Sequence, residues 1–389
     1  MALSIAGLIS LGFFLTSLVW WPWAYIPFEI PKVFIFGFFV KVLAICCIVS
    51  LLKKKSNWKV NKSISIFVIL FFVWSLTSSI FGSDIVKSLL GNYFRKDGLL
   101  TLIDLIAFFF FLSFFWKENY KKYISFSIFF SSLILSVVAI VEIVTNKFGL
   151  GSAATFGNPV FLAGYLALTL PFSYYLFRVS KKTKPLIFLG LMIVFSSLIL
   201  IKVTAAILTV LLFLLLLIIF QMKNKFKYIF FVLMFILGSF IFIQWLNDFK
   251  NDYIHLSRSE GRVRIFRNLG VATTLRPLMG YGWANVDYAF EKIEWPLSTT
   301  DDIYLDKAHS EILEVLVTTG IVGLVIYLAI IFSVFKISIK KFIQSKYGIW
   351  EFTILSVLIL YLFHSQTNII SIAEQMFFWF VVGINLKKY

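Results

Sequence analysis

Apolar runs that are long enough to cross a lipid bilayer recur along almost the whole of this chain. A run of eighteen or more apolar residues can span a hydrocarbon core about 30 Å thick. Hydrophobic residues make up 60% of the 389-residue sequence, whereas a soluble domain is usually about half apolar. The pattern therefore predicts an all-α polytopic membrane protein.

The hydropathy pattern predicts about twelve spans. We expect them to begin near Ala2, Val33, Ser63, Leu99, Tyr123, Phe156, Pro185, Val203, Tyr228, Gly320, Ile349 and Ile370. One long polar segment, 247–308, lies between the ninth and tenth spans. No repeat of fixed period and no low-complexity linker divides the sequence. We therefore predict a single membrane domain, 1–389, with a helical extracytoplasmic cap formed by 247–308.

Basic residues are distributed unevenly between the two alternating sets of loops. The formal net charge of +17 would suit a nucleic-acid partner, but the lysines cluster in short gaps between spans, as at Lys53, Lys54 and Lys55. This is the positive-inside pattern. It excludes nucleic acid as the partner and predicts that both termini are cytoplasmic and that 247–308 lies outside.

The sequence offers no pattern typical of a metal or nucleotide site. Cys46 and Cys47 are adjacent in an apolar run, so we interpret them as small buried hydrophobes. A zinc-type histidine pair, a thiolate cluster and a phosphate-binding loop of the G-x-x-x-x-G-K-[ST] kind are all absent from the sequence. Asp301 and Asp302 form an acidic pair that suits either a divalent cation or plain solvation. We predict no cofactor and no metal.

Two cationic positions lie at the ends of predicted spans. Lys202 falls between the apolar runs 185–201 and 203–220 with almost no loop around it. A charge at membrane depth is costly and marks a functional candidate; Lys202 either reaches the outer headgroups or lies at the mouth of an outer cavity. Arg95 lies in a segment bounded by glycines, which favours a tight turn that gathers backbone amides and cations, with a solvated loop as the alternative.

Polar residues at the start of the sixth span are explained by helix capping. Asn158 precedes Pro159, and asparagine caps a helix whose first turn accepts proline. His364 lies late in the eleventh span, beside Ser365 and Gln366. It either lines a cavity or only packs.

The segment 248–270 has the periodicity of an amphipathic helix. On a helical wheel, Arg262 shares a face with Ile265, Phe266, Leu269 and Ala272, whereas Arg264 and Arg267 lie opposite. An arginine on an apolar face is costly unless it is paired, and its planar fork suits a phosphate. A bound anion is one partner for Arg262; Glu260 or Asp248 is the structural alternative.

A turn and a second helix follow. Pro277, Gly280 and Gly282 after Arg276 predict a rigid turn that exposes backbone. The next helix is predicted to begin at Asp306 as its N-cap, which places His309 one turn inside, on the apolar face. The positive end of a helix disfavours a protonated imidazole, so a neutral His309 facing a cavity is a candidate general base. A core histidine with a satisfied hydrogen bond is the alternative.

The order and spacing of these motifs resemble the O-antigen ligase family, also called the O-antigen ligase/polymerase superfamily. The residues that carry the resemblance are Gly157-Asn158-Pro159 with Ala163, Gly164 and Tyr165; Lys202 with Thr204 and Ala205; Arg262 with Phe266; Arg276-Pro277 with Gly280 and Gly282; and His309 with Gly320 and Gly323. The chain departs from the family pattern at Ser310, where asparagine is usual, and at Lys202, where arginine is usual. Lysine keeps the charge but loses the bidentate geometry.

The resemblance implies a metal-independent glycosyltransferase that is multi-pass in a bacterial plasma membrane and works at its outer face. Such an enzyme moves a glycan from undecaprenyl pyrophosphate to an acceptor hydroxyl of a lipid A core, a growing polysaccharide or another cell-surface molecule. The base would be His309, and the leaving pyrophosphate would be held by Arg262 with Lys202, Arg95, Arg276 and Asn158. A one-step displacement of this kind inverts the anomeric centre.

Two other classes of protein are considered. A membrane transporter of a small anion would need ionisable residues at mid-membrane and paired broken helices, but carboxylates at depth are almost absent from the predicted spans. A metal-dependent lipid-phosphate transferase would need paired acids in the first outer loop, which offers only Glu29.

Overall fold

The computed structural model describes residues 2–24, 26–53, 62–145, 153–222, 262–293 and 305–386. Every regular element in these ranges is a helix. The bounds are α1 (Ala2–Leu18), α2 (Glu29–Leu52), α3 (Lys62–Ile80), α4 (Ile85–Leu90), α5 (Leu99–Phe115), α6 (Tyr120–Thr145), the 3-10 helix η1 (Ala154–Phe156), α7 (Pro159–Val179), α8 (Lys184–Ile201), α9 (Thr204–Gln221), α11 (Arg262–Leu275), α12 (Val286–Ile293), α13 (Glu311–Gln344), α14 (Ile349–His364) and α15 (Ile372–Leu386).

The helices of the membrane bundle begin close to the predicted span starts. Among the described residues, α2, α3, α6, α7, α8, α9 and α13 are long and apolar enough to cross a membrane, and α1, α5, α14 and α15 contain shorter apolar stretches. The predicted ninth span, near Tyr228, lies outside the described residues. The multi-pass helical architecture is confirmed, and the count of twelve stays a prediction.

Helix α7 lies at the centre of the bundle. In its membrane-length window 78% of the residues are buried, against 22% in α9. It packs against α6, α8, α9 and α14. The cap predicted at its start is present, because the Asn158 side chain accepts a hydrogen bond of 2.8 Å from the Val160 amide. Helix capping is therefore sufficient to explain why an asparagine stands at position 158.

Helix α13 is broken one third of the way along, at Gly320. This residue has φ 67° and ψ −174°, inside an otherwise helical segment. The break turns the Ile321 amide away from its helical partner, the Val317 carbonyl, and toward the Pro277 carbonyl at 2.8 Å. The part of α13 from Glu311 to the break therefore forms a separate short helix.

The turn after α11 fills the break. The amides of Tyr281 and Gly282 donate to the carbonyls of Val317 and Thr318, each at 2.9 Å. The Trp74 indole of α3 donates to the Thr319 carbonyl at 2.8 Å. Carbonyls freed by a break must find new donors when they are buried, and here the predicted rigid turn supplies two of them.

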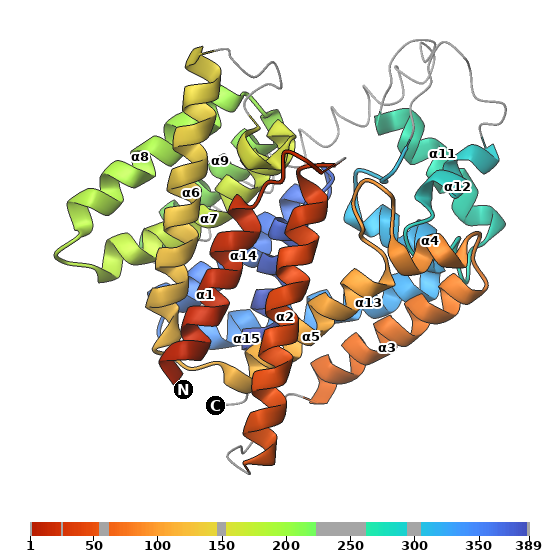
Figure 1. Ribbon diagram of the computed structural model, residues 1–389, viewed down its shortest axis with the longest axis horizontal. Helices are drawn as coiled ribbons and strands as arrows, with labels where there is room; N and C mark the ends of the chain where they lie inside the picture. The colour runs from red at the N-terminus through yellow and green to blue at the C-terminus, as the bar shows by residue number, and fades with distance from the viewer. Residues whose placement is uncertain are drawn as a thin grey trace.

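Helices α11 and α12 pack on a second, smaller apolar cluster beside the bundle. Its buried members are Leu269, Ala272, Tyr281, Val286, Ala289, Phe290, Leu305, Ala308 and Val317. Figure 1 shows α4, α11 and α12 gathered at one corner of the molecule, away from the start of α1. The predicted apolar face of α11 is present at Leu269 and Ala272, and Arg267 is exposed on the other side.

Candidate active site

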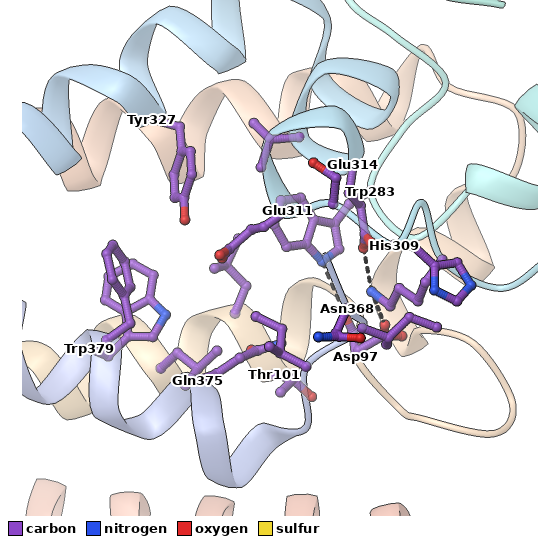
Figure 2. Close-up of a pocket in the computed structure, with 18 of the residues that line it drawn as sticks. Asp97, Thr101, Trp283, His309, Glu311, Glu314, Tyr327, Asn368, Gln375 and Trp379 are labelled. Atoms are coloured by element: carbon purple, nitrogen blue, oxygen red, sulfur yellow. Dashed lines mark hydrogen bonds and ion pairs between the residues drawn. The ribbon is translucent and has the colours of Figure 1, made fainter. Parts of the chain in front are cut away.

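A cavity of about 70 Å³ lies between the start of α13, α5, α15 and the turn that precedes α5. It has a charged end and an aromatic end. Figure 2 shows Asp97, Glu314 and His309 toward one end, Tyr327 and Trp379 at the other, and the Glu311 carboxylate between them. Such a volume has room for several water-sized groups.

Lys307 holds the charged end together. Its ammonium group contacts the carboxylates of Asp97 and Glu314 (Figure 2). Burial acts to lower the pKa of Lys307, but the two carboxylates outweigh it and raise that pKa above its usual value. Burial likewise acts to raise the pKa of Asp97, and Lys307 and Arg95 outweigh it, so the pKa lies below its usual range. Removing one partner from such a buried group strands a charge, which costs roughly 3–5 kcal/mol.

The turn that carries Asp97 also carries Arg95, as the flanking glycines predict. Gly91 has φ 82°, and a Cβ there would lie 2.3 Å from the Asp97 amide nitrogen. The Arg95 side chain is paired with Asp306, with 2.5 Å between Nε and Oδ2, and its guanidinium lies 5.1 Å from the centre of the Phe161 ring. Arg95 is thus a partly buried, paired cation behind the charged end, and it does not line the cavity itself.

The prediction that Asp306 caps the second helix is wrong. The helix begins five residues later, at Glu311, and its N-cap is Ser310, whose hydroxyl accepts from the Leu313 amide at 3.4 Å. The Asp306 carboxylate forms an ion pair with Arg95 instead. Ser310 has the extended backbone of an N-cap, and His309 just before it lies in the left-handed region with φ 54°.

His309 therefore does not lie one turn inside a helix, and the helical-wheel argument for it does not apply. The residue is half-buried and lies just before the N-terminus of α13. It still lines the cavity, at the charged end. The structure thus places His309 in the candidate site for a different reason from the one predicted.

Sequence reasoning missed Glu311 and Glu314, which line the cavity from the first turn of α13. They were missed because the predicted site was assigned to the apolar face of this helix together with His309, and both glutamates lie off that face. The signal that could have found them is simple: two carboxylates stand at the beginning of an apolar run, and an ionisable residue at membrane depth is a functional candidate. The Glu311 carboxylate accepts a hydrogen bond of 3.0 Å from the Tyr361 hydroxyl through Oε1.

The remaining predicted donor-binding residues do not line this cavity. Arg276 is exposed, with its guanidinium 5.1 Å from the centre of the Tyr281 ring. Lys202 is exposed at the end of α8, in the left-handed conformation. Arg262 begins α11, but its side chain, like Asp301 and Asp302, lies outside the described part of the chain. The roles assigned to these residues stay predictions.

A further buried polar pair lies behind the cavity. His364 Nε2 is 3.4 Å from Glu374 Oε1, and both side chains are almost wholly buried. A Cβ on Gly164 of α7 would lie 2.1 Å from that carboxylate oxygen. Of the two alternatives for His364, packing is the one the geometry favours, because His364 does not line the cavity.

Glu29, the single acid of the first predicted outer loop, lies in the first turn of α2 and is buried. Its carboxylate accepts from the Ile372 amide at 3.4 Å. Among the described residues, no three His, Cys, Asp or Glu side chains gather in a way that suits a metal ion.

Comparison with known proteins gives one family match, over part of the chain. Residues 189–328, from α8 into α13, match the family model described as O-antigen ligase. This stretch of the chain is similar to the O-antigen ligases. The resemblance predicted from the motifs is thereby confirmed, and it indicates glycan transfer of the ligase or polymerase type by a bacterial membrane protein. No curated protein matches the chain.

Proposed function

We propose that this O-antigen ligase-like protein transfers a glycan from undecaprenyl pyrophosphate to an acceptor hydroxyl at the extracytoplasmic face. The cavity at the start of α13 carries the proposal, because it joins a charged end to an aromatic and apolar end inside a membrane bundle. The donor has the same two-part character, with a pyrophosphate attached to a lipid. The family match covers the helix start, the turn and the break that form one wall of this cavity.

A departing pyrophosphate needs cations beside it. Lys307 lines the charged end but is held by two carboxylates, so Arg262, as predicted from the sequence, would supply the fork that donates two hydrogen bonds to a phosphate. Fixed cations in a site that excludes water stabilise developing negative charge strongly. In this proposal no metal takes part, and displacement in one step inverts the anomeric centre.

The proposal is tested with the purified protein in liposomes. Undecaprenyl-pyrophosphate-linked glycan and a glycolipid acceptor are supplied, and the glycosylated acceptor is measured by mass spectrometry. We expect transfer that persists in excess EDTA and a product of inverted anomeric configuration by NMR. Loss of transfer in EDTA would contradict metal independence, retention of configuration would contradict the one-step displacement, and failure to transfer to any hydroxyl acceptor would contradict the function.

A further inference from the structure

The first turn of α13 is held from outside by the loop 365–371, which joins α14 to α15. The first amides of a helix have no acceptor within the helix. Here the Glu311 amide donates to the Ser365 carbonyl at 2.9 Å, and the Ile312 amide donates to Gln366 Oε1 at 3.4 Å. The loop therefore supplies acceptors for two of these amides.

The side-chain amide of Gln366 ties this loop to the N-cap of α13. Its Oε1 also accepts from the Ser310 hydroxyl at 3.0 Å. Its Nε2 donates to the Ser365 hydroxyl at 3.0 Å, which fixes the direction of the amide. Ser310 is the position at which the chain departs from the family pattern, where asparagine is usual. A side-chain amide is thus present at this N-cap, but it comes from a distant part of the chain.

The loop is closed at its base by the buried carboxylate of Glu374. Its Oε2 accepts from the Ser371 amide at 2.8 Å, and its Oε1 lies 3.4 Å from His364 Nε2. The end of α14 and the residue before α15 are thus joined through one side chain. Gln366 is therefore presented from a fixed support, which a residue that positions another one needs.

The residue before this N-cap is His309, which lines the charged end of the cavity. Its φ of 54° lies in the left-handed region. Residues other than glycine adopt that region at a cost, and they keep it where the surrounding structure enforces it. The next residue, Ser310, is held by α13 on one side and by Gln366 on the other. The contacts of Ser310 therefore help to decide where the His309 ring lies.

We propose that Gln366 is a positioning residue for His309, because it supplies from the loop the side-chain amide that an asparagine would carry at position 310. This inference rests on the proposed function, with His309 as the base predicted from the sequence. As the acceptor oxygen bonds to the anomeric carbon, its proton passes to His309, and the electron pair of the broken bond leaves with the pyrophosphate. Gln366 does not line the cavity; it acts on the imidazole through the backbone of Ser310.

Exchange of Gln366 for leucine tests the assignment by transfer kinetics. Gln366→Leu keeps most of the size of the side chain but removes the acceptor for Ser310 and Ile312. Because a misplacement of about 1 Å can cost about 10²-fold in rate, we expect kcat to fall by about 10- to 100-fold while KM for the lipid-linked donor stays nearly constant. The matched control is Gln344→Leu, exposed at the other end of α13, which should transfer at the rate of the unaltered protein. An unchanged kcat in folded Gln366→Leu would overturn the inference.

A second substitution at the N-cap separates positioning from general damage to the fold. An asparagine at an N-cap accepts from the second or third amide of its helix, so in Ser310→Asn the cap no longer depends on the loop. Added to Gln366→Leu, Ser310→Asn should restore most of the lost kcat. In the protein that keeps Gln366, it should bring no gain. A loss that Ser310→Asn does not reverse would show that Gln366 does not act through the N-cap.

The environment of His309 can also be followed without any transfer. The chain has three histidines, so ring-labelled histidine gives three sets of NMR signals in detergent, and His309→Gln identifies one set. Those signals should shift in Gln366→Leu, return when Ser310→Asn is added, and stay in place in Gln344→Leu. Signals that do not move in Gln366→Leu would refute the positioning role. Absence of transfer by the unaltered protein would instead refute the proposed function, and the NMR signals would still decide whether Gln366 positions His309.

Discussion

The break in α13 gives the sharpest test of how this protein is built, because one added methyl group should undo it. In Gly320→Ala the new Cβ would lie 2.1 Å from the Leu278 carbonyl oxygen and 2.3 Å from its carbon. Both are backbone atoms, so they cannot move aside as a flexible side chain could. The backbone of Gly320, at φ 67° and ψ −174°, also lies in a region that is essentially reserved for glycine.

The expected cost follows from these contacts. A non-glycine residue in that region costs about 1–3 kcal/mol. If the turn is displaced, three backbone hydrogen bonds are lost, from Ile321 to Pro277, from Tyr281 to Val317 and from Gly282 to Thr318, at roughly 0.5–1.5 kcal/mol each. The substitution should therefore cost about 3–7 kcal/mol, a large part of the stability of an ordinary domain.

Gly270→Ala is the matched control. A Cβ at Gly270, inside α11, would meet nothing within 4 Å, and alanine in a helix interior is favoured over glycine by about 0.5–1 kcal/mol. Thermal unfolding in detergent should show Gly320→Ala well below the unaltered protein and Gly270→Ala at or slightly above it. Gly280→Ala presses on the same break from the other side, with a Cβ 2.5 Å from the Val317 carbonyl, so its effect should not add to that of Gly320→Ala. Equal melting temperatures for Gly320→Ala and Gly270→Ala would refute this account of the break.

Three other predictions follow from the charged residues and the topology. If Arg262 binds the donor pyrophosphate, Arg262→Ala should abolish transfer by folded protein while Arg264→Ala is much milder; equal losses would show that the wheel argument for α11 is wrong. Because the pKa of Asp97 lies below its usual value, its stabilising contribution is complete above the ordinary carboxylate pKa, about 4, and is lost as pH falls below that. The melting temperature of the unaltered protein should then decline below about pH 4 more steeply than that of Asp97→Asn, and parallel curves would contradict the pairing. In a protein whose two cysteines are replaced, Thr274→Cys should react with an impermeant thiol reagent on intact cells. Lys181→Cys, which is exposed just after the C-terminal end of α7, should not react. The reverse result would show that the predicted orientation is inverted.

The bundle could be predicted from the sequence because lipid imposes a simple rule on it. A span must be apolar for about twenty residues, and hydropathy reads that directly. Hence α5 and α14 begin at the predicted Leu99 and Ile349, and α3 begins within one residue of its predicted start at Ser63. The exceptions occur where polar residues belong to a helix, as at the buried Glu29 in the first turn of α2.

The start of α13 could not be placed in the same way, because two residues compete for the role of N-cap. Asp306 and Ser310 are both good caps by type. The choice is decided by Arg95, which lies more than two hundred residues earlier and takes the Asp306 carboxylate. No local pattern contains that contact, so His309 was placed on the wheel of a helix to which it does not belong, and the site was assigned to the face opposite Glu311.

The meaning of the glycine motif changes for a related reason. In the sequence, Gly280 and Gly282 predict a turn with exposed backbone, and Gly320 marks the predicted start of a span. In the fold they belong to one joint, where the turn approaches the broken helix so closely that a Cβ on Gly280 or Gly320 would meet backbone atoms at 2.5 Å or less. The glycines thus act on the candidate site indirectly: they fix the short first segment of α13, and that segment presents Glu311 and Glu314 to the cavity. A turn that is predicted to expose its backbone is explained here by backbone packing, and the polar groups that line the cavity beside it are the carboxylates and the lysine.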